Sequence, residues 1–341
     1  MTQFAEVVVI GAGASGLRLA GILSRGGISV VLVEARDRVG GRLLSVDRGI
    51  DLGATWFWQN EDDVLDVIAE CGLESFPQYA SGNMMYQVPG SVRELDGNPL
   101  DQQAWRIVGG MQNLTIGLAQ NLSAGTLQLS TKVTELRCDK GVTVTTDRGE
   151  WNAQHVVLAL PPAIALANIS FSPGLPADLV NIAKSTPVWM GAVTKVVAIY
   201  DSPFWRARGL AGSAMSHVGP LREIHDVSDR SGSFGALVGF CRERVVEGAV
   251  TAQLTEIFGA RAETPKSVFI KDWSRSEFTS PPGVFQLNDY QLFGSQVLRD
   301  AHFDERLHFA STETAIDSPG HVQGAFSAAR RTAESIMSSM R

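Results

Sequence analysis

The chain has 341 residues, of which 44% are hydrophobic and 19% are charged, and its formal net charge is −7. This composition is typical of a globular protein with one large core or two smaller ones, and it excludes a fibrous or disordered chain. The acidic net charge and the absence of a basic run argue against a nucleic-acid partner. The sequence also lacks the run of about 18 apolar residues that would predict a membrane span.

The cysteines and histidines are sparse and scattered. Cys71, Cys138 and Cys241 are far apart, and the six histidines form no HxH or HExxH pattern. We therefore expect neither a disulfide framework nor a metal site. The first predicted strand begins by about residue 6, which leaves no room for a signal peptide before it. A cytoplasmic, reducing location is the expectation.

The first 34 residues have the pattern of a strand, a glycine-rich turn, a helix and a second strand. The turn contains Gly11, Gly13 and Gly16, and the second strand ends at Glu34. The first glycine allows a tight turn, the second lets backbone amides approach a pyrophosphate, and the third lets the helix pack closely on the sheet. An acid roughly twenty residues farther on accepts ribose hydroxyls. The pattern predicts a bound dinucleotide. A tight turn without a ligand is the alternative.

Apolar periodicity predicts the elements that follow. In chain order these are a helix over 61–71, a hairpin over 82–96, a helix over 113–122, strands over 128–138, 142–146, 155–160, 192–200, 236–241, 267–272 and 307–310, and a helix over 320–337. The strand over 155–160 is wholly apolar, as expected of a parallel strand buried on both faces. The strands between 185 and 275 alternate and predict a second, mostly antiparallel sheet. Ser318 and Pro319 have the N-cap and first-turn preferences of a helix start.

Five segments, in this order, resemble motifs of the flavin-containing amine oxidases, the monoamine oxidase-like branch of the FAD oxidoreductases. They read GAGASGL (11–17), EARDRVGGR (34–42), DLGATW (51–56), FASTET (309–314) and GHVQGA (320–325). The resemblance extends over nearly the whole chain. It implies an α/β fold, α+β overall, in which a Rossmann-type FAD-binding domain carries an inserted, mostly antiparallel substrate domain. The expected FAD-binding segments are 1–75, 106–184 and 276–341, and the substrate segments are 76–105 and 185–275.

The resemblance also implies how FAD is held. Glu34 is expected at the adenosine ribose, Arg36 beside the adenine, Arg42 at the pyrophosphate and Glu313 near the ribityl–phosphate region, with a backbone contact from Val133 to the adenine. The full expected set is Gly11, Gly13, Ala14, Ser15, Gly16, Glu34, Ala35, Arg36, Gly41, Arg42, Gly53, Ala54, Thr55, Trp56, Val133, Trp273, Thr312, Glu313 and Val322. No cysteine follows Cys241, so noncovalent FAD is expected. Because an arginine can hold a 2′-phosphate, Arg36 leaves NADP as an alternative.

Two residues are expected to serve catalysis. Lys195 shares a strand face with Val193, Val197 and Ile199, where an unpartnered lysine is costly. By the resemblance it reaches a water at flavin N5 and assists the reaction of the reduced flavin with oxygen, and burial would lower its pKa. A lysine of an edge strand that reaches solvent is the alternative. His321 stands where relatives place one of two tyrosines that flank the flavin.

The substrate pocket is where this chain departs from the family. Trp58, Met84, Tyr86, Trp189, Phe278 and Phe285 are the expected pocket residues, although each has a simpler interpretation as a core residue. Roughly fifty residues separate Trp58 from Arg106, where relatives carry a much longer helical cap. The mouth of the pocket is expected to be more open, or to be covered by another subunit of a homodimer.

The activity implied by the resemblance is the oxidation of a primary amine to an imine and then an aldehyde, with O2 reduced to hydrogen peroxide. A polyamine oxidase or an L-amino-acid oxidase of the same fold is an alternative. The latter needs an arginine for the substrate carboxylate, for which Arg206, Arg222 and Arg242 are candidates. An FAD-dependent desaturase and a flavin-binding protein without amine turnover are the remaining alternatives.

Overall fold

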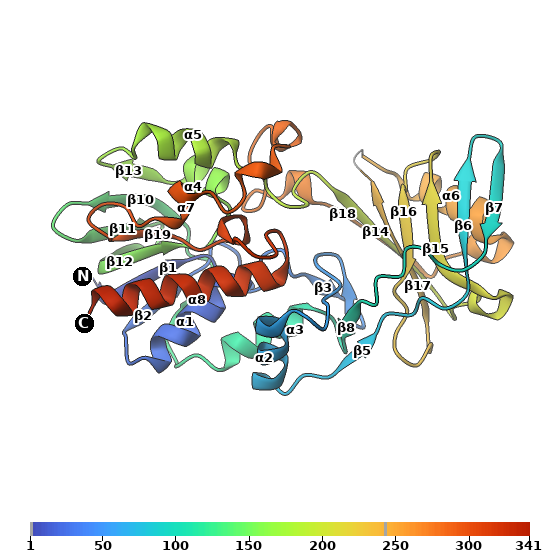
Figure 1. Ribbon diagram of the computed structural model, residues 1–341, viewed down its shortest axis with the longest axis horizontal. Helices are drawn as coiled ribbons and strands as arrows, with labels where there is room; N and C mark the ends of the chain where they lie inside the picture. The colour runs from blue at the N-terminus through green and yellow to red at the C-terminus, as the bar shows by residue number, and fades with distance from the viewer. Residues whose placement is uncertain (1–2, 242–243) are drawn as a thin grey trace.

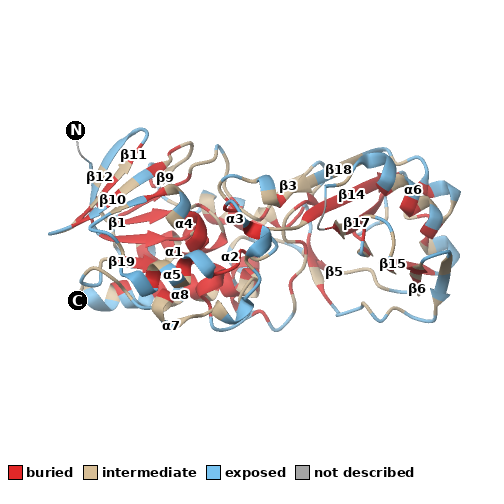
Figure 2. Cartoon of the chain, turned by 90° about the horizontal axis from the view of Figure 1, so that it is seen from above, coloured by how far each residue is buried: buried red, intermediate tan, exposed pale blue. Residues whose placement is uncertain are grey.

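The computed structural model describes residues 3–241 and 244–341. Two lobes follow each other along the long axis of the molecule, each built around one β-sheet, and both chain termini lie at the far end of the first lobe (Figure 1). The central strands of both sheets are buried, and exposed residues gather on the outer loops (Figure 2). None of the helices in the described ranges is long and apolar enough to cross a membrane.

The sheet of the first lobe is rich in parallel pairs. Its strand order is β13-β10-β11-β12-β1-β2-β9, with β19 paired to β12, and only the pairs made by β11 are antiparallel. The strands are β1 (Gln3–Ile10), β2 (Val30–Val33), β9 (Leu127–Gln128), β10 (Val133–Cys138), β11 (Val142–Thr146), β12 (Gly149–Leu158), β13 (Ser170–Ser172) and β19 (Leu307–Phe309).

Helices cover both faces of this sheet because its strands are apolar on both faces. Along β1, Val7 and Val9 pack against the helices α1 and α8, whereas Val8 and Ile10 pack on the side of α4, α5 and α7 (Figure 1). The helices of the first lobe are α1 (Ala14–Arg25), α2 (Asp62–Glu70), α3 (Gln112–Gln120), α4 (Pro162–Asn168), α5 (Ala177–Ser185), α7 (Gln296–Arg299) and α8 (Val322–Ser339).

The sheet of the second lobe has the order β18-β14-β17-β16-β15-β6-β7, in which only β6 and β15 pair in parallel. One face packs on α6 (Glu247–Phe258), and the other packs on Ile50 and Leu52 from the first lobe. The strands are β6 (Asn83–Val88), β7 (Ser91–Leu95), β14 (Thr194–Tyr200), β15 (Leu210–Ser216), β16 (Glu223–Asp226), β17 (Gly235–Cys241) and β18 (Ser267–Asp272).

Short elements complete the chain. Two small ribbons, β3 (Ser45–Val46) with β4 (Ile50–Asp51) and β5 (Ser75–Pro77) with β8 (Trp105–Ile107), lie between the lobes (Figure 1). The 3₁₀ turns are Arg206–Arg208, Ala260–Ala262, Trp273–Arg275, Val284–Gln286, Tyr290–Leu292 and Thr312–Thr314.

The predicted fold class is confirmed: a mixed α/β molecule with one parallel-rich sheet and one mostly antiparallel sheet. Every strand of the second sheet comes from 76–105 or 185–275, although the domain boundaries themselves stay a prediction. One strand prediction was wrong, and several elements were missed. The strand predicted over 128–138 is divided between β9 and β10, with Ser130 at φ +51 between them. Strands β15 and β16 and helices α4, α5 and α6 were not predicted.

The start of the last helix was also predicted wrongly. Its N-cap is His321, not Ser318, which adopts the left-handed φ of +49. Ser318 begins a turn instead, because its carbonyl accepts the His321 amide at 3.1 Å. The Gly320 amide within this turn donates to Thr312 Oγ1 at 2.8 Å. Tertiary contacts from Thr312 thus decide where α8 begins.

Candidate functional site

A cavity of about 360 Å³ lies between the lobes. It begins at the carboxyl ends of β1 and β2, the edge at which ligands bind in open α/β sheets, and it extends to the first turn of α8. Most of the expected cofactor residues line it: Gly11, Gly13, Ala14, Ser15, Glu34, Ala35, Arg36, Gly41, Arg42, Gly53, Ala54, Thr55, Trp56, Val133, Trp273, Thr312 and Val322.

The glycine-rich turn has the backbone that its sequence predicts. Gly11 has φ +104, and a Cβ there would lie 2.9 Å from the carbonyl oxygen of Ala159. A Cβ on Gly16 would lie 1.9 Å from the Gly11 oxygen, so Gly16 packs beneath the turn and does not line the cavity. Gly13 is the N-cap of α1 and offers no side chain to cap it. The free amides of the first helical turn therefore face the cavity and suit an anion.

Glu34 is buried at the end of β2, and the backbone holds its carboxylate in place. Oε2 accepts the Ala12 amide at 2.8 Å, and Oε1 accepts the Arg36 amide at 2.9 Å. A carboxylate has about four acceptor positions, so two remain for hydroxyl groups in the cavity. The Arg36 guanidinium lies 5.4 Å from the ring centre of Phe278 and donates to Thr279 Oγ1 at 2.8 Å. Phe278 therefore lies at the Glu34 end of the cavity, not in the substrate pocket for which it was predicted.

Arg42 and Glu313 form a bidentate ion pair with N–O distances of 2.7 and 3.1 Å. Arg42 lines the cavity, but Glu313 is completely buried beneath it and does not. The same carboxylate accepts the Trp189 amide at 3.3 Å. Glu313 therefore holds two lining residues, Arg42 and Trp189, in place and does not itself face the cavity.

Lys195 is 3% exposed and lies in the wall of the cavity. Its ammonium donates to the Gly53 carbonyl at 2.7 Å and to Thr55 Oγ1, and it lies 5.6 Å from the ring centres of both Trp56 and Phe240. The alternative of a solvent-reaching edge lysine is excluded, because β14 lies between β17 and β18.

A buried carboxylate accompanies this lysine. Burial lowers the pKa of Lys195 to about 7, and the negative charge of Asp51 opposes that shift. Burial in turn raises the pKa of Asp51 to about 6, against the effect of the lysine charge. Asp51 Oδ1 accepts from Ser45 Oγ at 2.6 Å and from the Met111 amide at 2.9 Å, whereas Oδ2 is buried without a hydrogen-bond partner among the described residues.

Aromatic rings surround the opposite end of the cavity. Trp58 stacks on His321 with ring centres 5.2 Å apart and an interplanar angle of 27°, and the ring of Trp189 lies 6.4 Å from His321 on a tilted plane. All three line the cavity. His321 Nδ1 lies 3.0 Å from Glu61 Oε1. His321 was predicted to lie beside the flavin, whereas Glu61 was not predicted as a site residue.

A second cavity, of about 590 Å³, adjoins the first. The two share the side chains Trp56, Trp58, Met190, Val193 and Phe240. The second cavity also contains Asp101, Arg222, Glu223 and His225, and Glu223 Oε1 lies 2.6 Å from His225 Nε2. This hydrogen bond holds the pKa of Glu223 below its usual value. The second cavity thus combines aromatic walls with a few charged groups, as binding sites for small molecules do.

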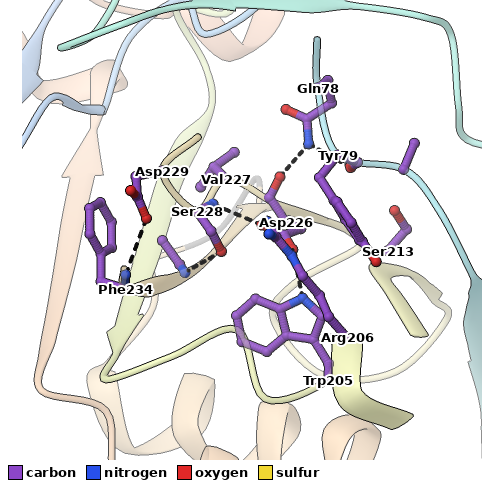
Figure 3. Close-up of polar contacts among 12 residues, drawn as sticks. Gln78, Tyr79, Trp205, Arg206, Ser213, Asp226, Val227, Ser228, Asp229 and Phe234 are labelled. Carbon is purple, nitrogen blue, oxygen red and sulfur yellow. Dashed lines mark hydrogen bonds and ion pairs between the residues drawn. The ribbon is translucent and has the colours of Figure 1, made fainter. Parts of the chain in front are cut away.

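A buried network fixes the wall of the second cavity (Figure 3). The Asp226 carboxylate accepts hydrogen bonds from Arg206 Nε and Nη2, at 2.7 and 3.0 Å, and from the indole N–H of Trp205 at 2.7 Å. Gln78 donates to the Asp226 carbonyl and accepts the Trp56 indole N–H at 2.9 Å. Because its charge is satisfied in this network, Arg206 is not available to a substrate carboxylate. Arg222 lines the cavity, and Arg242 lies outside the described residues.

Three expected pocket residues line neither cavity. Met84 and Tyr86 lie on β6, whose partners β15 and β7 are at the edge of the second sheet away from Lys195. Tyr86 is hydrogen-bonded to His217 Nε2 at 2.9 Å there. Phe285 is 59% exposed on a 3₁₀ turn. Their placement follows from the strand order, which local patterns do not reveal.

Three further cavity residues were not predicted as site residues. Val193 had a signal in the sequence, because it precedes Lys195 by two positions and was expected on the same face. Phe240 had none, because it is directly opposite Lys195 only through the pairing of β14 with β17. Met190, which precedes β14, likewise had no signal in the sequence.

Comparison with known proteins points to one family. The sequence profile described as flavin-containing amine oxidoreductase matches residues 14–107 and 94–337. The putrescine oxidase of Kocuria rosea is 26% identical, over 85% of this chain and 82% of that protein. The L-amino acid dehydrogenase of Synechocystis sp. is 24% identical, over 97% and 94%. The structure of cyclohexylamine oxidase from Brevibacterium oxydans aligns with a TM-score of 0.86 at 22% identity, over 98% of this chain and 99% of that one.

Proposed function

Because this chain belongs to the flavin-containing amine oxidoreductases, we propose that it is an FAD-dependent oxidase of primary amines that uses O2 as its electron acceptor. The observation that carries the proposal is Lys195, which is buried in the cavity wall and held by Gly53 and Thr55. A buried lysine is costly to keep, and a protein that only bound a flavin, or a desaturase, has no evident need of one there.

The residues of the first cavity fit FAD. The uncapped start of α1 at Gly13 suits the pyrophosphate, and Glu34 keeps acceptor positions free for the ribose hydroxyls. The start of α8 at Val322 suits the flavin ring, because its free amides would stabilise negative charge on the reduced ring. A 2′-phosphate would meet the Glu34 carboxylate, which argues against NADP. When bound, FAD supplies the hydride acceptor and then the electrons for oxygen.

The side chains around the cavity would bind the amine and place a positive charge beside the flavin. Aromatic walls at Trp56, Trp58 and Phe240 remove water from the alkyl part of an amine. Lys195 holds a proton, or a water, beside the position expected for the flavin ring, and its positive charge favours electron transfer to oxygen. None of the three cysteines lines the first cavity, which supports noncovalent FAD.

One observation favours a second candidate, the oxidation of L-amino acids. Arg222 lines the second cavity, where a guanidinium would bind a substrate carboxylate. Glu223 lies beside it on β16 and Asp101 lines the same cavity, and both would repel that carboxylate. We therefore place amino acids second to amines.

The test begins with the purified protein. We expect a flavin absorbance band, release of FAD into the supernatant on acid precipitation, and bleaching of the band when a primary amine is added without oxygen. Admission of oxygen should restore the band and yield one hydrogen peroxide per turnover. Protein without flavin would overturn the cofactor assignment. A flavin that amino acids bleach and amines do not would favour the second candidate.

A further inference from the structure

The backbone around His321 is fixed by contacts that leave its ring facing the cavity. Thr312 Oγ1 accepts the Gly320 amide and donates to the His321 carbonyl, both at 2.8 Å. Gly320 has φ +87 and lies against Trp189, where a Cβ would come within 2.6 Å of the indole. The His321 side chain, at the N-cap of α8, is 38% exposed and lines the cavity.

The carboxylate of Glu61 determines which ring nitrogen of His321 is engaged. Glu61 Oε1 lies 3.0 Å from Nδ1, and Oε2 accepts the Trp58 amide at 3.1 Å. The Glu61 side chain is 5% exposed, and the residue is the N-cap of α2, where the helix dipole favours a negative charge. With Nδ1 donating to Glu61, the neutral ring presents Nε2 as an acceptor, and Nε2 has no hydrogen-bond partner among the described residues.

Two further carboxylates in this region, those of Asp63 and Glu313, are already paired. On α2, Asp63 accepts from Arg330 at 3.1 Å. Beneath Trp189, the carboxylate of Glu313 is occupied by Arg42. Of the described residues, the aromatic rings against the imidazole are the indole of Trp58, which stacks on it, and that of Trp189, which is tilted to it, and neither carries a charge. The carboxylate in contact with the imidazole is therefore that of Glu61, and the arrangement is an acid–histidine pair beside an aromatic wall.

We propose that His321, held by Glu61, takes the proton from the substrate ammonium and so generates the neutral amine that is oxidised. The proposal rests on the proposed function and names the base for it. An alkylammonium ion has a pKa near that of lysine, about 10.4, so roughly one molecule in 2,500 is neutral at pH 7. Hydride can leave only a carbon whose nitrogen has a free electron pair.

The step is a proton transfer, and nothing is oxidised or reduced in it. The N–H bond of the ammonium breaks, its electron pair stays on the amine nitrogen, and the proton forms a bond to His321 Nε2. The resulting imidazolium is stabilised by Glu61, as a carboxylate stabilises a protonated histidine in other acid–base pairs. Trp58 stacks on the ring and lines both cavities, so its face binds the cation next to the base.

The test is anaerobic stopped-flow measurement of flavin reduction between pH 6.5 and 10 with H321N and E61Q. Asparagine keeps an N–H at the place of Nδ1 and so preserves the contact with Glu61, but it accepts no proton. We expect the second-order rate constant of H321N to be at least roughly tenfold lower than wild type at pH 7. The deficit should shrink steadily towards pH 10, where more than roughly a quarter of the amine is neutral in water. E61Q should show a smaller deficit with the same pH dependence.

A second substrate separates this role from a structural one. A β,β,β-trifluorinated amine is largely neutral at pH 7, so with this substrate the flavin of H321N should be reduced as fast as that of the wild type. An equal deficit at every pH and with both amines, or no deficit at all, would overturn the assignment while leaving the proposed function intact. A wild-type flavin that no amine reduces would overturn both.

Discussion

Two opposing effects act on the pKa of Lys195. Burial lowers the pKa of its ammonium to about 7, and the Asp51 carboxylate limits that shift. The lysine is therefore mostly protonated below pH 7 and mostly neutral above it. Its hydrogen bonds to Gly53 and Thr55 hold the ammonium in one position, so the change of charge occurs at a fixed place in the cavity wall.

This charge predicts how oxygen reactivity depends on pH. In the wild type, reoxidation of the reduced flavin should slow as pH rises through 7, because the ammonium that favours electron transfer to oxygen is lost. In Lys195→Met, reoxidation should be at least roughly tenfold slower at pH 6 and independent of pH across this range. Stopped-flow mixing of reduced enzyme with oxygen measures both.

Lys266→Met is the matched control, because Lys266 is exposed and pairs with Asp201 at the surface. It should reoxidise like the wild type. Anaerobic reduction of Lys195→Met by amine should change less than its reoxidation does. Unaltered oxygen kinetics in Lys195→Met would contradict the role.

At the scale of elements, the junction before α8 is the most constrained segment of the site. Gly320 combines a positive φ with direct contact to Trp189. Gly320→Ala should lower the free energy of unfolding by about 1–3 kcal/mol, because the added methyl group must displace the indole and the backbone is strained. It should also weaken flavin retention, because the first turn of α8 would shift.

The measurement is denaturant unfolding together with the flavin-to-protein absorbance ratio after gel filtration. Gly248→Ala is the control, since a Cβ there meets no heavy atom within 4 Å and the residue is in the first turn of α6. That variant should be as stable as the wild type or more stable. Equal behaviour of the two variants would refute the proposed constraint at Gly320.

The junction before α8 also shows which local structures could be predicted from the sequence and which could not. The turn at Gly11 was predicted correctly because its requirements are local: a tight turn after a strand and a helix close behind it. The N-cap preference of Ser318 is also a local signal, yet it lost to hydrogen bonds from Thr312, which belongs to a different turn. A local preference worth about 1 kcal/mol is readily overridden by tertiary contacts of this kind.

At the scale of the whole molecule, the order of strands was the information that the sequence lacked. Alternation along β14 correctly grouped Lys195 with Val197 and Ile199, because a strand's two faces are defined by its own residues. Which strands are neighbours is not local. Met84 and Tyr86 were therefore assigned to a cavity that β6 does not reach. Glu61 escaped notice for the same reason, since its partner His321 is 260 residues away.

Because FAD would contact both lobes, its binding should stabilise the whole molecule. Protein stripped of flavin should unfold at a lower temperature than the holoprotein, and added FAD should restore the midpoint in a concentration-dependent way. Ligand at a thousandfold its dissociation constant contributes about 4 kcal/mol. Differential scanning fluorimetry over an FAD series measures the shift, with NADP as the comparison. A midpoint that does not move with FAD would count against the assigned cavity.

The hydrogen bond from Lys195 to the Gly53 carbonyl joins a strand of one lobe to a loop of the other. At 2.7 Å it tolerates little relative sliding of the two sheets, since about 1 Å of shear would break it. The apolar contacts of Ile50 and Leu52 with the second sheet, being non-directional, would survive the same displacement. Misalignment of the lobes would therefore impair reaction with oxygen while the protein remained folded. The rate of flavin reoxidation consequently reports how the two lobes are aligned.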